Sequence, residues 1–271
     1  REVCFRAGNT YSAADFETLE VRPNARLSHP YATTLSGNAM FNGDGTFLSC
    51  FCAYEDGTSG VLVARADGSL FKEVYHWAET ERRLQHVQAA NLDELVITFA
   101  LYPDFQNKPE GGPERRARAW KLDVASGKAR PFLCMPPGFR ATHEYWGPRG
   151  VPRLFFHKKT VPEWVPTWIC SISIDGDDYQ EHYRSDDRRL GHSCVSADLT
   201  QLVTDVQDPE GNELLLVKMD SGEAETLCWP DSSVLDGKVG HVHPSLSPSG
   251  SKVLFTSDRE GKAAVYIVPL I

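Results

Sequence analysis

The chain has 271 residues, of which 41% are hydrophobic, and it carries a formal net charge of −9. This length and apolar content suit one all-β propeller or barrel with a packed core, so we expect a single folded domain over residues 1–271. The acidic balance argues against a nucleic-acid-binding protein, which needs a basic face to displace phosphate counterions, and no apolar run of about 18 residues suggests a membrane span.

The cysteines indicate a reducing environment. All seven are scattered along the chain and none forms a CxxC pair. This pattern fits free thiols better than a disulfide framework, and it favours a cytoplasmic protein. Cys50 and Cys52 lie in a strand-like run, where we expect small buried side chains.

The main organising signal is a repeat of about fifty residues. A polar turn followed by a β-rich run recurs at 42–51, 92–98, 148–156, 197–204 and 248–255. Most repeats continue to a second strand and a second hairpin turn, at 61–68, 119–127, 172–176 and 214–222. Strands joined in this way by hairpins form the four-stranded antiparallel blade of a propeller. We therefore predict an all-β fold, a β-propeller with five recognisable blades.

Three segments fall outside the repeat. Residues 1–32 contain strand-like pieces but no full blade, and we expect them to be the end of an earlier one. Either a short propeller closes with their help, or N-terminal blades are lacking. Residues 102–116 and the Trp-rich stretch 163–168 contain proline and charge, which predicts two irregular loops, and no helix of note is expected.

Histidine recurs near the start of successive repeats, at His86, His143, His192 and His243, with His241 just before the last. The first strands of propeller blades line a central channel, so these side chains are expected to converge there. His241 and His243 are two residues apart, and on a strand they point the same way. Three neutral imidazoles can hold a divalent ion such as Zn, Mn, Fe or Ni. The alternative is that each histidine only hydrogen-bonds to backbone of the neighbouring blade.

The other candidates are weaker. We expect a structural role for His86, and a surface or packing position for the histidines without a motif, which are His29, His76, His157 and His182. Arg115, Arg116 and Arg118 precede a predicted strand, where a guanidinium can form a bidentate pair with a carboxylate ligand. The alternative for these arginines is a solvated basic turn.

Several motifs occur together between residues 85 and 271. They are Arg118 with Trp120, THEYW at 142–146, His192 at the head of its repeat, VLDG at 234–237, HVHPS at 241–245 and LFTSD at 254–258. In order and spacing they resemble the oligogalacturonate lyases, seven-bladed propeller enzymes that split short pectin fragments by β-elimination.

The resemblance implies a role for each matching residue. His192, His241 and His243 are expected to ligate a divalent metal, which is manganese in the family. His143 is expected to be the proton-abstracting base, and Arg118 to bind the acidic oligosaccharide substrate near the cleaved bond. These residue types suit the reaction, because a metal ion or arginine stabilises the charge that builds on the uronate carboxylate, and a neutral histidine accepts a proton near neutral pH.

The sequence departs from the family pattern in two places. The family places a glutamine ligand shortly before the HxH pair, whereas residues 237–240 read GKVG, and a protonated Lys238 cannot coordinate metal. The fourth ligand is then water, a residue from elsewhere, or absent. The family chain is also longer at its N-terminus, with a histidine-rich first blade. Two alternatives stay open: a lyase for a different uronate oligosaccharide, and a non-catalytic TolB-like propeller that binds proteins or sugars.

Overall fold

The structure is a computed structural model that describes residues 2–7, 10–15, 18, 20–26, 32–35, 40–67, 69–103, 106, 112–208, 211–233 and 241–270. The chain divides into two units. Unit 1 comprises Arg1–Cys134 with Arg149–Pro152, and unit 2 comprises Met135–Pro148 with Arg153–Ile271. No helix among the described residues has the length and apolar character needed to cross a membrane.

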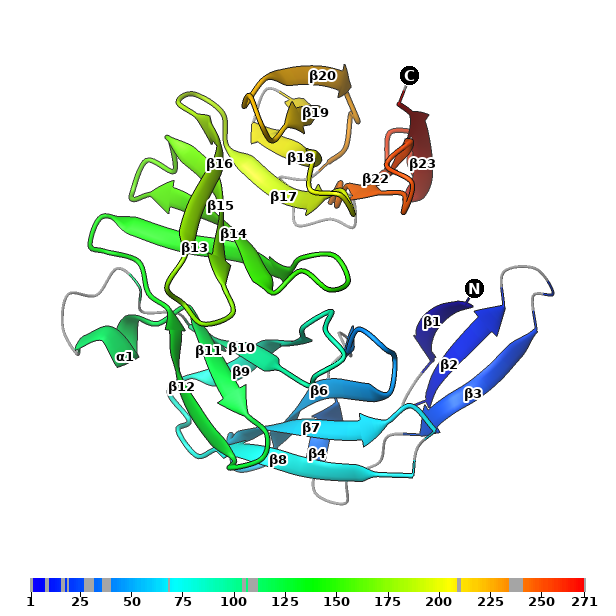
Figure 1. Cartoon of the computed structure of the whole chain (residues 1–271), viewed down its shortest axis with the longest axis vertical. Helices are drawn as coiled ribbons and strands as arrows, with labels where there is room; N and C mark the ends of the chain where they lie inside the picture. The colour runs from blue at the N-terminus through cyan, green and yellow to red at the C-terminus, as the bar shows by residue number, and fades with distance from the viewer. Residues whose placement is uncertain are drawn as a thin grey trace. The chain divides into compact units, whose positions relative to one another are not determined.

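Unit 1 contains three antiparallel sheets (Figure 1). The first is formed by β1 (Glu2–Ala7), β2 (Thr10–Asp15) and β3 (Val21–Arg26). The second is formed by β4 (Ala32–Leu35), β5 (Met40–Phe41), β6 (Phe47–Tyr54), β7 (Ser59–Arg65) and β8 (Phe71–Trp77), with β4 and β5 both paired to β6. The third is formed by β9 (Arg83–Ala89), β10 (Ile97–Tyr102), β11 (Ala119–Asp123) and β12 (Lys128–Leu133).

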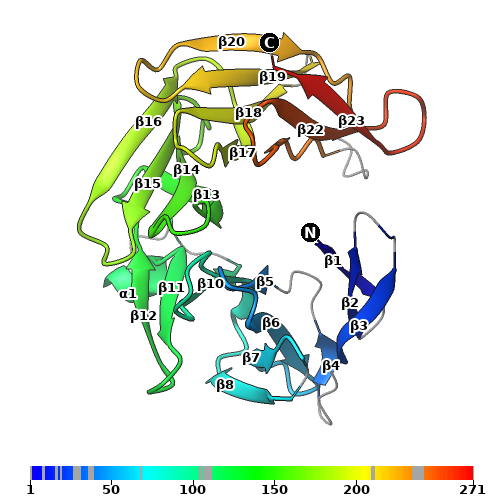
Figure 2. The same ribbon diagram turned by 45° about the vertical axis from the view of Figure 1, so that its right-hand side comes forward.

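Unit 2 also contains three antiparallel sheets, drawn from green to red in Figures 1 and 2. The first is formed by β13 (Phe139–Trp146), β14 (Arg153–Thr160), β15 (Thr167–Ser173) and β16 (Tyr179–Ser185). The second is formed by β17 (Leu190–Val195), β18 (Gln201–Asp208), β19 (Gly211–Lys218) and β20 (Ala224–Cys228). The third is formed by β21 (Ser245–Leu246), β22 (Lys252–Ser257) and β23 (Ala264–Pro269). The first strands β13 and β21 both contact β17.

The five sequence repeats correspond to five of these sheets. In four of them the polar turn of the repeat lies between the first and second strands, and the strands pair in chain order. In the sheet β4–β8 the turn lies between β5 and β6, and both β4 and β5 pair with β6. Residues 2–26 form the additional three-stranded sheet, which matches the incomplete blade expected there. Antiparallel meanders of this kind are propeller blades, so the predicted architecture is confirmed at the level of the blade.

Two predicted segments differ in detail. The strand expected at 172–174 is only the end of β15, which begins at Thr167, because Trp168, Ile169 and Cys170 are buried and extend the sheet into the stretch expected as a loop. The loop expected at 102–116 contains a five-residue helix, α1 (Gly112–Arg116). Cys50 and Cys52 are buried, as predicted.

The first strands share an irregularity that positions the histidines. In three sheets two residues of the first strand face one residue of the second, so that His86–Val87 lies opposite Phe99, His143–Glu144 opposite Phe156, and Gly191–His192 opposite Asp205. Such β-bulges bend a strand and turn a side chain out of the sheet's regular alternation. His86, His143 and His243 also have positive φ angles of 50°, 53° and 43°. Non-glycine residues rarely adopt this conformation, and it is typical of functional positions.

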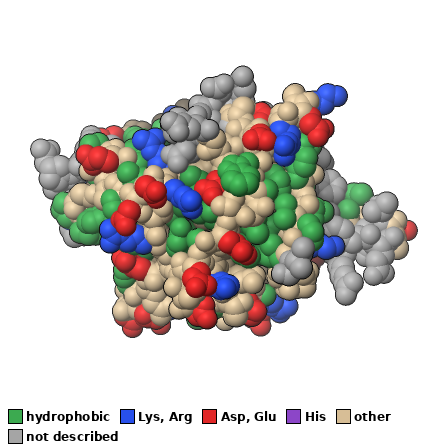
Figure 3. Space-filling model, turned by 90° about the horizontal axis from the view of Figure 1, so that it is seen from above, with side chains coloured by type: hydrophobic (Ala, Val, Ile, Leu, Met, Phe, Trp, Pro, Cys, Tyr) green, Lys and Arg blue, Asp and Glu red, His purple; other side chains and the backbone are tan. Residues whose placement is uncertain are grey.

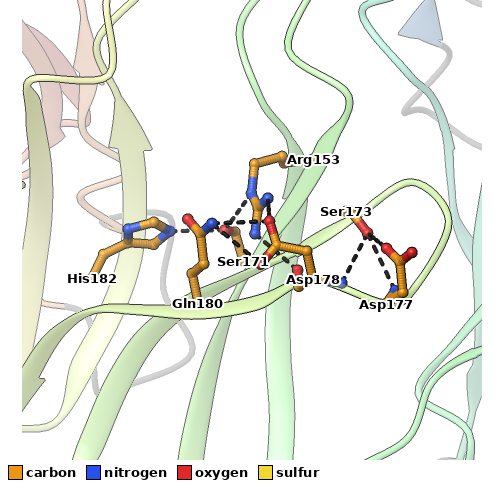
Figure 4. Close-up of polar contacts among 7 residues, drawn as sticks. All are labelled: Arg153, Ser171, Ser173, Asp177, Asp178, Gln180 and His182. Carbon is orange, nitrogen blue, oxygen red and sulfur yellow. Dashed lines mark hydrogen bonds and ion pairs between the residues drawn. The ribbon is translucent and has the colours of Figure 1, made fainter.

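The hydrophobic core of unit 2 lies mainly between its first two sheets. Phe155 and Ile169 pack there against apolar side chains of the next sheet, which are Leu190, Val195, Leu202, Val206, Leu215 and Val217. The outer part of the first sheet carries a polar network in which Arg153 donates to Ser171 and Asp178, and His182 contacts Ser171 (Figure 4). Apolar contacts therefore hold the first sheet of unit 2 against the second, whereas these polar contacts join strands within the first sheet.

We expect Phe155→Ala to destabilise the fold by about 3–5 kcal/mol, the usual cost of removing a fully buried phenylalanine. Phe155 is 0% exposed and its ring stacks on Tyr145 at 5.6 Å. Urea or thermal unfolding of both proteins measures the difference. Leu254→Ala is the control, because Leu254 is 44% exposed on the last sheet. Apolar side chains at the surface are common in this protein, since hydrophobic side chains lie between charged ones on the face seen in Figure 3. A loss below about 1 kcal/mol at Phe155 would contradict the packing described here.

Candidate metal centre

Three histidines of unit 2 meet although they come from different segments. One ring nitrogen from each of His192, His241 and His243 lies within 4.8 Å of the others. The ring centroids of His192 and His243 are 3.7 Å apart, and each lies 5.7 Å from that of His241. Among the described residues this is the one group of three histidine, cysteine or acidic side chains placed to share an ion. The predicted convergence is therefore present in this unit.

The backbone brings His241 and His243 together in a way that the sequence did not predict. The prediction placed them on a strand, but β21 begins only at Ser245. Val242 between them is fully buried among Val203, Val253 and other apolar side chains, and its carbonyl accepts a hydrogen bond from the Thr256 amide at 2.8 Å. Because the Val242 side chain is anchored in the core, the side chains of His241 and His243 point to the opposite side of the backbone. The side chains of these three residues therefore alternate as on a strand, although the residues do not form a regular strand.

His143 lies beside this group. Its ring centroid is 4.3 Å from that of His192. The buried Nδ1 atom of His143 has no hydrogen-bond partner among the described residues, whereas the ring does contact the Gly191 backbone. Burial, together with the nearby His157 and His192, lowers the pKa of His143 well below its usual value. The imidazole is therefore neutral near pH 7, with an uncommitted nitrogen.

His157, His143, His192 and His243 form a row of neighbouring rings, with His157 at one end. Both ring nitrogens of His157 are engaged in hydrogen bonds. Its side chain is completely buried, with Nε2 2.8 Å from Ser193 Oγ and Nδ1 3.4 Å from the Leu190 carbonyl. Ser193 Oγ in turn lies 3.0 Å from Tyr145 Oη. Burial lowers the pKa of His157 to about 3, so it stays neutral. The sequence predicted a surface or packing position for His157, and the structure gives a buried one, with the ring edge-on to that of His143 at a centroid distance of 5.6 Å.

A buried carboxylate orients His192. Asp205 is 0% exposed and accepts a short hydrogen bond from the His192 amide, and its Oδ1 lies 3.5 Å from Nδ1 of the ring. Gln207 Nε2 donates to Asp205 Oδ2 at 3.2 Å and lies 3.4 Å from the same Nδ1. Both partners approach Nδ1, so Nε2 of His192 is left for a ligand. Gly191 makes this possible, because a Cβ there would lie 2.6 Å from Asp205 Oδ2.

The remaining predicted site residues belong to unit 1 or fall outside the described residues. Arg118 belongs to unit 1, where it precedes β11, is 8% exposed, and its amide donates to the Leu133 carbonyl at 2.8 Å. This burial contradicts the alternative of a solvated turn for Arg118. Lys238, the VLDG segment and His29 lie outside the described residues. His86 is exposed in unit 1.

Two curated proteins are similar to part of the chain. Over 180 residues the chain is 28% identical to the oligogalacturonide lyase of Pectobacterium atrosepticum, and over 168 residues it is 27% identical to the oligogalacturonate lyase of Dickeya dadantii. Each match covers 56% of this chain and 42% of the relative, so the chain spans less than half of these relatives. The chain resembles the oligogalacturonate lyases. No protein-family model matches it.

Solved structures show the same fold. An oligogalacturonate lyase in complex with manganese and the oligogalacturonate lyase of Vibrio parahaemolyticus both match with a TM-score of 0.80 and 20% identity, over 100% of this chain and 74% or 75% of theirs. TolB from Acinetobacter baumannii matches with a TM-score of 0.59 and 12% identity, over 99% of this chain and 60% of its own. The predicted β-propeller fold is confirmed.

The residues present suit a divalent metal. Imidazole nitrogens bind Mn, Fe, Zn and Ni, and a buried carboxylate behind a ligating histidine is a common outer partner of such sites. Burial and the charge of His192 lower the pKa of His243 to about 4, which keeps it in the neutral, metal-binding form. The donor set and its supporting carboxylate therefore fit an ion held by His192, His241 and His243.

We expect Asp205→Asn to weaken Mn²⁺ binding about 10- to 100-fold, the usual cost of losing an outer-shell partner. The substitution removes the buried charge behind His192 and sets an amide NH₂ against Gln207 Nε2, which now donates to Asp205. Calorimetric titration with Mn²⁺ measures the loss. Asp198→Asn is the matched control, because Asp198 is exposed in a turn and bonds only Ser196 and Thr200. An equal Mn²⁺ affinity of the two variants would show that Asp205 does not support the metal site.

Proposed function

We propose that the chain is a metal-dependent lyase that cleaves short oligogalacturonates by β-elimination, giving 4,5-unsaturated uronate products. The observation that carries the proposal is the meeting of His192, His241 and His243 beside His143, whose Nδ1 has no described partner. The names of the relatives, and the manganese complex of a protein with the same fold, support the reaction and the metal.

The metal would be held by His192, His241 and His243. When bound it supplies positive charge that stabilises the substrate carboxylate as negative charge develops on it. The contribution of the protein is orientation: Asp205 and Gln207 fix the His192 ring at Nδ1, and the buried Val242 fixes the backbone between the other two histidines.

His143 is the proposed base. Burial keeps its imidazole neutral, so one ring nitrogen carries a lone pair that can accept a proton. The proton on the carbon next to the uronate carboxylate moves to the His143 imidazole, a carbon–carbon double bond forms, and the bond to the leaving sugar oxygen breaks, with that oxygen protonated by water. General base catalysis of this kind contributes about 100- to 10,000-fold.

Arg118 is proposed to bind the substrate carboxylate near the cleaved bond. A guanidinium presents paired donors that match a carboxylate, and it stays charged at all pH values at which a protein is folded. The support for this role is the spacing of Arg118 and Trp120 in the family motif.

Incubation with oligogalacturonates and Mn²⁺, followed by absorbance of the unsaturated product, tests the proposal. We expect product with Mn²⁺ and none after chelation. If product forms only from another uronate oligosaccharide, the proposed reaction stands and the proposed substrate is wrong. No product from any uronate, together with no stoichiometric metal in the purified protein, would contradict the proposal and favour a TolB-like binding module.

A further inference from the structure

Positive charge gathers in unit 2 at one end of the histidine row. Lys159 lies at the end of β14, directly opposite Arg140 of β13. The Lys159 side chain is only 3% exposed, and no hydrogen bond or ion pair joins it to another residue in the described part of the chain. Burial of a lysine that no carboxylate pairs with is costly, and such a perturbed charged group is a candidate functional residue.

Most of the charged groups that act on Lys159 are positive. Two like charges, Arg140 and Arg189, act on it, and Asp205 is the one described carboxylate that offsets them. Asp205 is already engaged with the His192 amide and with Gln207. Burial, reinforced by the two arginines, lowers the pKa of Lys159 to about 8, despite the opposing effect of Asp205. In a chain of net charge −9 this local excess of cations suits an anionic ligand.

An exposed indole lies next to the same cations. Trp164 is 37% exposed, with Lys159 Nζ 5.0 Å and Arg140 Cζ 5.6 Å from its ring centroid. The loop holds Trp164 at a φ of 71°, where its amide donates to the Thr160 carbonyl and its own carbonyl accepts from Thr167 Oγ1. A ring face that packs on a sugar and cations that bind its carboxylate are together the groups that recognise a uronate.

We propose that Lys159, Arg140 and Trp164 form a subsite for a second uronate unit of the substrate, next to the unit that is cleaved. The inference rests on the proposed function and deepens it. Its place beside the reacting unit follows from β14, where Lys159 lies two residues after His157 and therefore on the same face, while the His157 ring lies 5.6 Å from that of His143. Lys159 binds the carboxylate of the second unit and Trp164 packs against its ring, so an oligosaccharide binds better than a single uronate.

Binding of trigalacturonate and of its methyl ester, titrated calorimetrically with chelator present to prevent turnover, separates these contributions. We expect Lys159→Met to weaken binding of the acid about tenfold and to leave the ester unchanged, because a charge-assisted hydrogen bond is lost. We expect Trp164→Ala to weaken both ligands about fivefold, because ring packing does not depend on the charge. In the Mn²⁺-loaded protein both variants are expected to raise KM for trigalacturonate more than they lower kcat.

Two matched controls come from the same unit. Lys218 is exposed and pairs only with Glu223, and Trp229 is 62% exposed, so Lys218→Met and Trp229→Ala are expected to bind both ligands like the unchanged protein. An equal effect of Lys159→Met on acid and ester, or none on either, would overturn the subsite. Lys159-dependent binding without cleavage would support the subsite and refute the lyase proposal. Cleavage with an unchanged KM in both variants would support the lyase proposal and refute the subsite.

Discussion

The His192→Ala variant is expected to lose stoichiometric Mn²⁺ and, with it, lyase activity. His192 is the member of the metal group with a ring contact to each of the other two histidines and to His143. Removing it leaves two imidazoles, and it also leaves the buried Asp205 without the ring that it orients. The loss of Mn²⁺ affinity should exceed the roughly 10- to 100-fold cost of losing an outer partner alone. Metal analysis after dialysis and calorimetric titration measure it.

A histidine of the same unit serves as the control. His182 contacts Ser171 in the network of Figure 4, and in the described part of the chain it makes no contact with the metal group, so His182→Ala should retain one Mn²⁺ per chain. Added Mn²⁺ should also raise the melting temperature of the unchanged protein and of His182→Ala, but not that of His192→Ala, because only a bound ion stabilises the folded state. Full metal content in His192→Ala would refute the proposed ligand set.

The fold was predictable because its signals are local. Hairpin turns need residues that tolerate positive φ, and Gly45, Gly127, Gly176, Gly222 and Gly250 occupy such positions, at φ angles between 65° and 88°. The β-branched and aromatic runs between those turns form the strands. The bounds of β15 were missed because buried side chains from Trp168 onward extend the strand, and burial depends on the neighbouring sheet rather than on local sequence.

The supporting side chains of the site were not predicted, because their partners lie on other strands. Asp205 lies opposite the bulge of β17. The corresponding bulges of β9 and β13 lie opposite Phe99 and Phe156. Aligning the repeats at this position would have shown one carboxylate in place of two phenylalanines, which is a signal that sequence alone contains. His157 gave no such signal, since its role comes from Ser193 and the Leu190 carbonyl on the next sheet.

The geometry of the predicted ligands has a different origin from the one expected. Strand alternation alone was used to bring His241 and His243 together, yet the positive φ of His243 and the anchored Val242 set their positions. Bulges in β13 and β17 likewise place His143 and His192. Irregular backbone of this kind is fixed by tertiary packing, so residue types were predictable and their orientation was not.

The His143→Ala variant is expected to lose activity about 100- to 10,000-fold while retaining its metal and its fold, because the loss removes one proton-transfer group from the reaction. The Nδ1 atom of His143 has no hydrogen-bond partner among the described residues, so the substitution breaks no hydrogen bond at that atom. The loss should appear in kcat, with KM for oligogalacturonate changed little, since a base acts on the transition state more than on the bound substrate.

Metal content distinguishes His143 from the ligands. His143 lies 4.3 Å from His192 by ring centroids, so an indirect effect on the ion has to be measured rather than assumed. One Mn²⁺ per chain with kcat reduced about 100-fold or more identifies His143 as the base. Loss of Mn²⁺ would instead indicate that His143 is a further metal ligand. An unchanged kcat would indicate that another group accepts the proton. His76→Ala is the control, because that side chain is 49% exposed in unit 1 and contacts Glu73, so both its metal content and its kcat should equal those of the unchanged protein.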